Sequence, residues 1–327
     1  MHQWLVALLL VGMLGCTAVT PSEPELRAID QSRIPPPKLT LTVPGLGPCT
    51  DTVDRSLRLN PQQPVVVLVH GCLGSAGRFR ALAEVFAFSG QQAVCFSYND
   101  RDSLMVSSEQ LIASLEDLTG HLESRKLTVI GHSQGGLIAR KALVADRPKP
   151  LARDADVQLV TISAPFSGIA AASHCGSPLA TFLSLGLTIP ICQLASGAKW
   201  YEITGASAFI QEPGALVAQV REYLKINTDE ADSCRRGKAD GGCAEKDYVF
   251  SLEEQQLPEV EGGAAPQNLD VRAGHVEIVG DNRVAPLKLI AALQKDGILQ
   301  TPRPERSAAF GRLLTRLYGV APKEEIR

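Results

Sequence analysis

The 327-residue sequence lacks an excess of charge of either sign, because 32 Lys and Arg residues stand against 35 Asp and Glu residues, for a net charge of −3. Binding to nucleic-acid phosphates needs clustered Lys and Arg, so no nucleic-acid partner is expected. Charged residues make up only 20% of the chain and hydrophobic residues 45%. This composition excludes global disorder and predicts a globular protein with a real core.

The apolar run at the amino terminus, residues 4–15, is too short to cross a bilayer, which needs about 20 residues. Its length is typical of the core of a signal peptide. The run ends in Met13-Leu14-Gly15-Cys16, which resembles a bacterial lipobox, where a cysteine is lipidated and becomes the new terminus. We therefore expect an exported lipoprotein of the outer membrane or cell envelope, with signal peptide 1–15 and anchor Cys16. Ordinary secretion is the alternative.

Proline is frequent in the segment that follows, residues 17–48. Because proline removes backbone donors and fixes φ, we expect residues 16–60 to be mainly a tether, in which residues 39–43 could form a short edge strand. Residues 61–300 are expected to form one catalytic domain, and residues 301–327 a carboxyl-terminal tail or helix.

The body of the chain alternates between strand and helix patterns. The β-branched run Val65–Val69 is typical of a strand buried on both faces, and Leu111, Leu115, Leu118 and Leu122 lie on one helical face. Such alternation predicts βαβ crossovers, and so an α/β fold with a mostly parallel sheet. The expected strands are 64–69, 93–98, 127–130, 157–162, 223–227 and 269–272.

Gly131-His132-Ser133-Gln134-Gly135 fits the pattern G-x-S-x-G, and it follows a strand pattern and precedes a helix pattern. In this context the pattern predicts a nucleophile elbow, a tight turn that lifts the serine hydroxyl above the sheet and needs small residues on both sides. A serine at a glycine-rich helix start is the alternative. The elbow makes Ser133 the candidate nucleophile.

A second glycine-rich segment, His70–Ser75, directly follows the first buried strand. An oxyanion hole needs two backbone N–H donors, one from the residue after the nucleophile and one from the first strand–helix loop. Gln134 and Cys72 occupy these positions and are the predicted donors. An ordinary turn is the alternative for the 70–75 segment.

With these motifs, the chain resembles the α/β-hydrolase superfamily, and within it bacterial lipases and serine esterases. The resemblance rests on residues 65–75, 127–140 and 160–168 and on the region of Asp247 and His275. It implies an α/β-hydrolase fold, a triad in the chain order Ser, Asp, His, and a cap over the site, which we place at residues 166–218. The apolar residues of this cap could form an acyl groove or simply pack as core.

The resemblance places the general base in a loop after the last strand, where His275 lies. The other five histidines belong to the signal segment, to motif positions, to a helix end or to the cap. The acid is expected to be Asp247, in a D-x-V-x-x-like pattern, with Asp229 or Asp240 as alternatives. The predicted triad is Ser133, Asp247 and His275.

The eight cysteines fit either a redox or metal protein or an exported protein, and the signal-like terminus and the loop between Cys234 and Cys243 favour export. We expect Cys234–Cys243 to close a polar loop and Cys175 and Cys192 to be able to bridge the cap. Cys95 is interpreted as an inert buried thiol, while a Cys49–Cys72 bridge is an open alternative. The cysteines do not have metal-site spacing with histidine, and no metal or cofactor is expected.

The motifs together predict a serine hydrolase of carboxylic esters, a lipase or esterase acting on acyl lipids through an acyl-enzyme. An acyltransferase using the same triad is one alternative. A non-catalytic lipoprotein that keeps the fold for binding is the other. The oligomeric state is left open.

Overall fold

The computed structural model describes residues 23–72, 74–145, 151–172, 197–238, 240–261 and 266–319. The expected signal peptide, the anchor Cys16 and the expected Cys175–Cys192 pair lie outside these residues.

A seven-stranded sheet forms the centre of the molecule, in the order β11-β8-β7-β6-β4-β5-β2. All neighbours pair in parallel except β2, which is antiparallel to β5. Every strand expected from the sequence is present, and the mostly parallel α/β architecture is confirmed. The strands are β2 (Leu46–Gly47), β4 (Val65–Val69), β5 (Gln92–Phe96), β6 (Lys126–His132), β7 (Asp156–Ile162), β8 (Val220–Asp229) and β11 (Gln267–Arg272).

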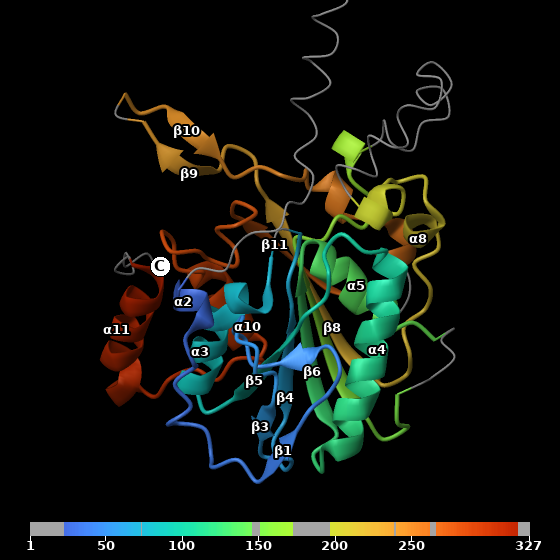
Figure 1. Cartoon of the computed structure of the whole chain (residues 1–327). Helices are drawn as coiled ribbons and strands as arrows, with labels where there is room; N and C mark the ends of the chain where they lie inside the picture. Colours follow the sequence, from blue (N-terminus) through green and yellow to red (C-terminus); the bar gives the residue numbers. More distant parts are fainter. Residues whose placement is uncertain are drawn as a thin grey trace, which may run out of the picture.

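Alternation along β4 divides the core into two layers. Val65, Val67 and Val69 pack with the helices α4 and α5, whereas Val66 and Leu68 pack with α3, α10 and α11. Figure 1 shows these two helical layers on opposite faces of the sheet. The helices are α3 (Arg80–Phe88), α4 (Leu104–His121), α5 (Gln134–Ala142), α10 (Leu287–Lys295) and α11 (Ser307–Tyr318).

Short helices complete the connections between these elements. They are α2 (Glu23–Leu26), α8 (Ala208–Gln211), α9 (Pro258–Glu261), η1 (Ala76–Phe79), η2 (Ala170–Ala172), η3 (Gly197–Trp200), η4 (Glu253–Gln255) and η5 (Pro304–Arg306). Within the described ranges, no helix is both long and apolar enough to span a bilayer.

The segment that we expected to be a tether is partly built into the domain. β1 (Leu39–Leu41) pairs with β3 (Leu57–Leu59), which confirms a strand at this place, and β2 extends the central sheet. A disulfide joins Cys49 to Cys95 on β5. The interpretation of Cys95 as a free thiol and the Cys49–Cys72 alternative were therefore wrong. Proline content alone did not separate a tether from an ordered segment whose few apolar residues are buried.

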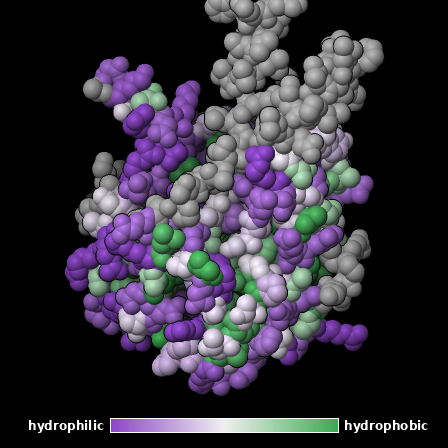
Figure 2. Space-filling view, viewed as in Figure 1, coloured by the Kyte–Doolittle hydropathy of each residue, from purple (hydrophilic) through white to green (hydrophobic). Residues whose placement is uncertain are grey.

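A disulfide-closed hairpin projects from the body near the carboxyl end of β8 (Figure 1). Its strands are β9 (Cys234–Gly237) and β10 (Cys243–Lys246), and Cys234 bonds to Cys243 as predicted. Seen from the same direction, Figure 2 shows mainly hydrophilic residues on this hairpin. Cys72 is also disulfide-bonded, and none of the described cysteines is free. Disulfides persist in oxidising compartments, which agrees with the expected export.

Candidate active site

Ser133 lies at the turn between β6 and α5 with φ 55° and ψ −127°. This is a strained conformation for a residue with a side chain. The glycines on either side make the turn possible. A Cβ on Gly131 would lie 2.3 Å from the carbonyl oxygen of Gly135, and a Cβ on Gly135 would lie 2.3 Å from that of Val69. The strand–turn–helix context that the G-x-S-x-G pattern predicts is therefore present.

The loop after β4 approaches the serine closely. A Cβ on Gly71 would come within 2.9 Å of the Cβ of Ser133, so only glycine lets this backbone pass. Cys72 follows directly in the same loop. Gln134 is the first residue of α5, where backbone N–H groups have no partner within the helix. The two predicted oxyanion donors thus belong to segments on either side of Ser133.

His70 and Tyr98 hold the base of this loop. Their rings stack with centroids 4.3 Å apart, and the Tyr98 hydroxyl donates to the His70 carbonyl at 2.6 Å. Burial lowers the pKa of His70, so its imidazole is neutral at pH 7. This ring therefore supports the loop without adding charge.

His275 lies in the loop after β11. It contacts the elbow through His132, the residue before Ser133. The rings of His132 and His275 are 4.7 Å apart, and His132 Nε2 donates to the His275 carbonyl at 3.0 Å. Burial, and then the charge of His275, hold the pKa of His132 well below its usual value. The edge of Phe250 also contacts the His275 ring, with centroids 4.8 Å apart.

The carboxylate beside His275 is that of Glu230, one residue past the end of β8. Glu230 Oε1 lies 2.8 Å from His275 Nδ1 and accepts from the Ser163 hydroxyl at 2.8 Å. Its Oε2 accepts the backbone N–H groups of Val249 at 2.6 Å and Phe250 at 2.9 Å. Because the Glu230 oxygens accept a hydrogen bond at each of these contacts, the side chain is suited to remain an ionised carboxylate.

Burial alone would raise the pKa of Glu230, but the hydrogen bond and charge of His275 and the N–H groups of Phe250 and Val249 outweigh it. The pKa of Glu230 therefore lies below its ordinary value of 4.5. Ser163 adds a further contact, since its Oγ lies 2.9 Å from His275 Nδ1. At neutral pH these groups present the imidazole with a fixed negative partner.

Asp247, the expected acid, occupies a different position. Its carboxylate accepts the backbone N–H of Val276 at 3.0 Å and of Glu277 at 2.9 Å, and its carbonyl accepts the N–H of His275 at 3.0 Å. A Cβ on Gly274 would lie only 2.2 Å from this carboxylate. Asp247 therefore shapes the loop that carries His275, and our assignment of this residue to His275 Nδ1 is corrected to Glu230.

The two alternative acids also lie elsewhere. Asp229 accepts from the N–H of Ala231 at 3.1 Å, and Asp240 is exposed near the tip of the hairpin. Glu230 was not predicted, because the resemblance implied an aspartate in the chain order Ser, Asp, His. The signal was present in the sequence, since two acidic residues, Asp229 and Glu230, stand at the carboxyl end of β8 and triads of this kind accept Asp or Glu.

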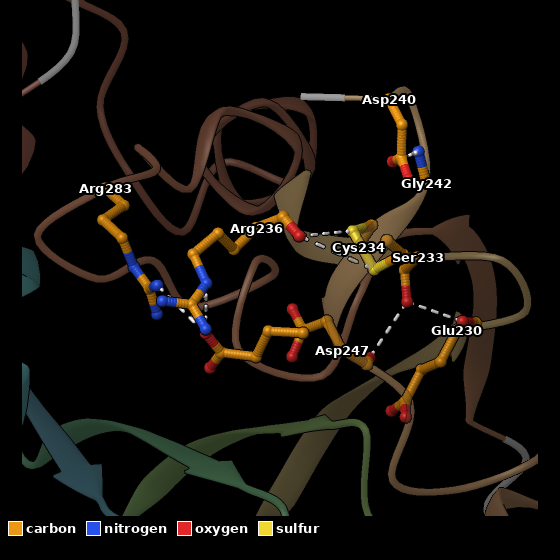
Figure 3. The surroundings of a disulfide bond; sticks show 10 residues. Glu230, Ser233, Cys234, Arg236, Asp240, Gly242, Asp247 and Arg283 are labelled. Carbon is orange, nitrogen blue, oxygen red and sulfur yellow. Dashed lines mark hydrogen bonds and ion pairs between the residues drawn. A yellow bond between two sulfur atoms is a disulfide. The ribbon is translucent and has the colours of Figure 1, made fainter. Parts of the chain in front are cut away.

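The hairpin joins Glu230 to Asp247 at its base. Ser233 donates to the carbonyl oxygens of Glu230 at 2.6 Å and Asp247 at 3.0 Å, as Figure 3 shows. Farther out, Arg235 bridges Glu245 at 3.2 Å and Asp281 at 2.7 Å. The hairpin is thus connected both to Glu230 and to the segment that follows His275.

The described parts of the expected cap pack against the body. Phe166, Phe209 and Ile210 are buried in the same core layer as α5. These residues favour the interpretation of the apolar positions as core. The remainder of the expected groove, including Phe182 and Leu183, lies outside the described residues. Among the described side chains, no cluster of His, Cys, Asp and Glu could hold a metal ion.

A strained serine on an elbow of a parallel sheet, with a histidine from the last strand's loop packed against the residue before that serine, is typical of the α/β-hydrolase class. A family model described as palmitoyl protein thioesterase matches residues 64–227, half of the chain, and the chain belongs to this family.

Similar solved structures have low sequence identity to this chain. Lipase BlEst2 of Bacillus licheniformis in its propeptide form is 17% identical, with TM-score 0.54, over 81% of this chain and 54% of that chain. Its mature form is 17% identical, with TM-score 0.49, over 80% and 99%. A Paleococcus ferrophilus monoacylglycerol lipase is 14% identical, with TM-score 0.47, over 72% and 96%. The comparison with curated proteins gave no match.

Proposed function

We propose that the protein is a serine hydrolase that cleaves carboxylic esters of acyl lipids through Ser133, His275 and Glu230. The observation that carries this proposal is the 2.8 Å contact of Glu230 Oε1 with His275 Nδ1, since His275 also contacts His132, the residue before the strained Ser133. A buried imidazole that is hydrogen-bonded to a carboxylate and held at a nucleophile elbow is the arrangement expected of a base that activates a nucleophile.

The proposed reaction begins with the tautomer of His275. Because Nδ1–H is held by Glu230, Nε2 carries the free lone pair and removes the proton of Ser133 Oγ as this oxygen attacks the ester carbonyl. The imidazolium is stabilised by Glu230 and then gives its proton to the leaving alcohol. Water, activated by the same Nε2, cleaves the acyl-enzyme, and the product acid leaves Ser133 free.

The negative oxygen of each tetrahedral intermediate is assigned to the backbone N–H groups of Cys72 and Gln134. Donors of this kind act on charge that develops only in the transition state, and loss of one costs about 10²–10³ in turnover. The disulfide at Cys72 supports this assignment, because it restrains the loop that carries one of the two donors.

Membership of the palmitoyl protein thioesterase family favours a substrate with a long acyl chain. It also makes a thioester the second candidate for the bond that is cleaved. The same triad and oxyanion hole serve both bonds, since both reactions pass through an acyl-enzyme. An acyltransferase would use an alcohol or amine acceptor in place of water. A non-catalytic binding protein would have no need of the strained serine.

Attachment to a membrane is proposed to come from lipidation of Cys16, in an exported protein of the cell envelope. The two described disulfide bonds support export. Metabolic labelling with a clickable fatty acid tests the anchor, since Cys16→Ser should abolish incorporation. Labelling that survives this change would contradict the proposal.

The catalytic proposal is tested by fluorophosphonate labelling of the wild type and of Ser133→Ala. We expect labelling of the wild type alone, and equal labelling of both proteins would contradict the assignment of the nucleophile. A chain-length series of nitrophenyl esters and matched thioesters then identifies the substrate bond. We expect long acyl chains to be preferred, and a sharp preference for acetyl would exclude an acyl-lipid substrate.

A further inference from the structure

A buried lysine lies beside the two proposed oxyanion donors. Lys199 belongs to η3 and is only 1% exposed. Its Nζ donates to the side-chain Oε1 of Gln134 at 2.6 Å and to the carbonyl oxygen of Asp100, and it lies 3.6 Å from Cys72 Sγ. One ammonium group therefore contacts both residues of the proposed oxyanion hole.

The backbone around Lys199 is fixed to the loop after β5. Gly197 has φ +79°, and a Cβ on this residue would lie 2.2 Å from the carbonyl oxygen of Arg101. The N–H of Ala198 donates to the same carbonyl at 2.7 Å. On the other side of η3, Glu202 accepts from the Ser103 hydroxyl at 2.8 Å. The contacts of its own segment therefore fix the backbone of Lys199 inside the protein.

Gln134 is held from two directions at this point. Its side-chain Nε2 donates to the Asp100 carbonyl at 3.2 Å, and its Oε1 accepts from Lys199. Removing the ammonium would leave a buried amide oxygen without this partner, at a cost of about 1–3 kcal/mol. The first residue of α5 would then lose the contact that fixes its rotamer.

Burying an ammonium group costs folding free energy unless the group is paired and hydrogen-bonded. The charged and titratable groups around Lys199 are Asp100 and Arg101, from the loop after β5, and His70, from the loop after β4. Burial lowers the pKa of Lys199 to about 8, Asp100 opposes this shift and Arg101 adds to it. The group is therefore mainly protonated at pH 7 and neutral above pH 9.

We infer that Lys199 is a positioning residue of the oxyanion hole, which orients Gln134 and the Cys72 loop and places a positive charge behind the developing oxyanion. The inference rests on the proposed function. A fixed positive charge in a dry site favours the anionic intermediate over the neutral ester, so its effect falls on turnover more than on substrate binding.

The test replaces Lys199 by the neutral, similarly long methionine. We expect Lys199→Met to lower kcat about 10- to 100-fold, with KM within about twofold of the wild type. The wild-type kcat should fall as the pH rises through about 8, where the ammonium deprotonates. This alkaline decline should be absent in the variant, a difference that a merely structural lysine would not produce.

Lys141 supplies a matched control. It is also a buried lysine, whose Nζ donates to the carbonyls of Phe209 and Glu212, away from Ser133. Lys141→Met should lower stability and leave kcat and its pH profile unchanged. A Lys199→Met enzyme with wild-type kcat and alkaline profile would overturn the inference.

A second readout does not depend on turnover. In ¹⁵N-labelled protein, the backbone amide signal of Gln134 should shift between pH 7 and 9 in the wild type and stay fixed in Lys199→Met. If Ser133→Ala retained full activity, the proposed function would fail, while the amide titration would still decide whether Lys199 holds Gln134. An amide that titrates identically in both proteins would contradict the positioning role.

Discussion

Glu230 and His275 form a buried hydrogen-bonded contact in the candidate site, with Oε1 and Nδ1 2.8 Å apart and the carboxylate fully shielded from solvent. The two residues come from the ends of neighbouring parallel strands, β8 and β11. Such a pair sets both the orientation of the imidazole and the nitrogen that carries its proton.

Replacing Glu230 by glutamine tests the role of this carboxylate. We expect Glu230→Gln to lower kcat for nitrophenyl esters about 10³- to 10⁴-fold, because the amide cannot stabilise the imidazolium. In the variant, the NH₂ group of glutamine also faces a donor that meets a carboxylate oxygen in the wild type, such as the Ser163 hydroxyl or the Phe250 N–H. Steady-state kinetics on folded, monodisperse protein measure the effect.

Asp229→Asn is the matched control for this substitution. Asp229 precedes Glu230 in the chain, and its carboxylate accepts only the local N–H of Ala231 among the contacts of the described residues. The control should keep turnover within about threefold of the wild type. Equal losses in the two variants would show that the assignment of the acid to Glu230 is wrong.

Asp247 should matter through the shape of the loop that carries His275. Asp247→Ala leaves the partly buried N–H groups of Val276 and Glu277 without these acceptors, which costs up to about 3 kcal/mol for each unsatisfied group. We expect urea denaturation to show this loss, with a smaller fall in kcat than for Glu230→Gln. A fall as large as that of Glu230→Gln would restore Asp247 as the acid.

The order of strands and helices could be predicted from the sequence because β-branched runs and helical leucine spacing are local signals. Ser133 and His275 could be predicted as candidates for a similar reason, because each lies in a short motif at a strand end. The acid could not be chosen from local pattern, since Glu230 and Asp247 both bind the His275 loop. The hairpin between them brings the two together, and only the fold determines which carboxylate faces Nδ1.

The depressed pKa of Glu230 predicts a pH dependence of stability. An acid whose pKa is lower in the folded state stabilises the fold above its unfolded value of 4.5, and this contribution is lost as the pH falls through the lower folded pKa. The stability difference between wild type and Glu230→Gln should therefore be largest near pH 7 and shrink below pH 4.5. Urea midpoints at both pH values measure it, and a constant difference would contradict the shifted pKa.

The two described disulfides should differ in their effect on stability. Cys49–Cys95 closes a loop with a separation of 46 residues, whereas Cys234–Cys243 spans 9. In the chain-entropy account, Cys49→Ala with Cys95→Ala should cost about 4 kcal/mol, and the hairpin pair about 1.5 kcal/mol less. Denaturant unfolding of both double variants measures this order. A larger loss from the hairpin pair would show that the hairpin supports the domain more than loop length predicts.

The nucleophile elbow should tolerate no side chain at Gly135. A Cβ there would meet the carbonyl oxygens of Val69 at 2.3 Å and His70 at 2.4 Å, so Gly135→Ala must displace β4 or the elbow. We expect it to lower the unfolding free energy by more than about 3 kcal/mol and to abolish fluorophosphonate labelling.

Gly120→Ala is the matched control, because Gly120 lies in α4 and its added Cβ would meet nothing within 4 Å. That variant should gain up to about 1 kcal/mol from helix propensity and label normally. Normal labelling of a stable Gly135→Ala protein would contradict the close packing of the elbow against β4.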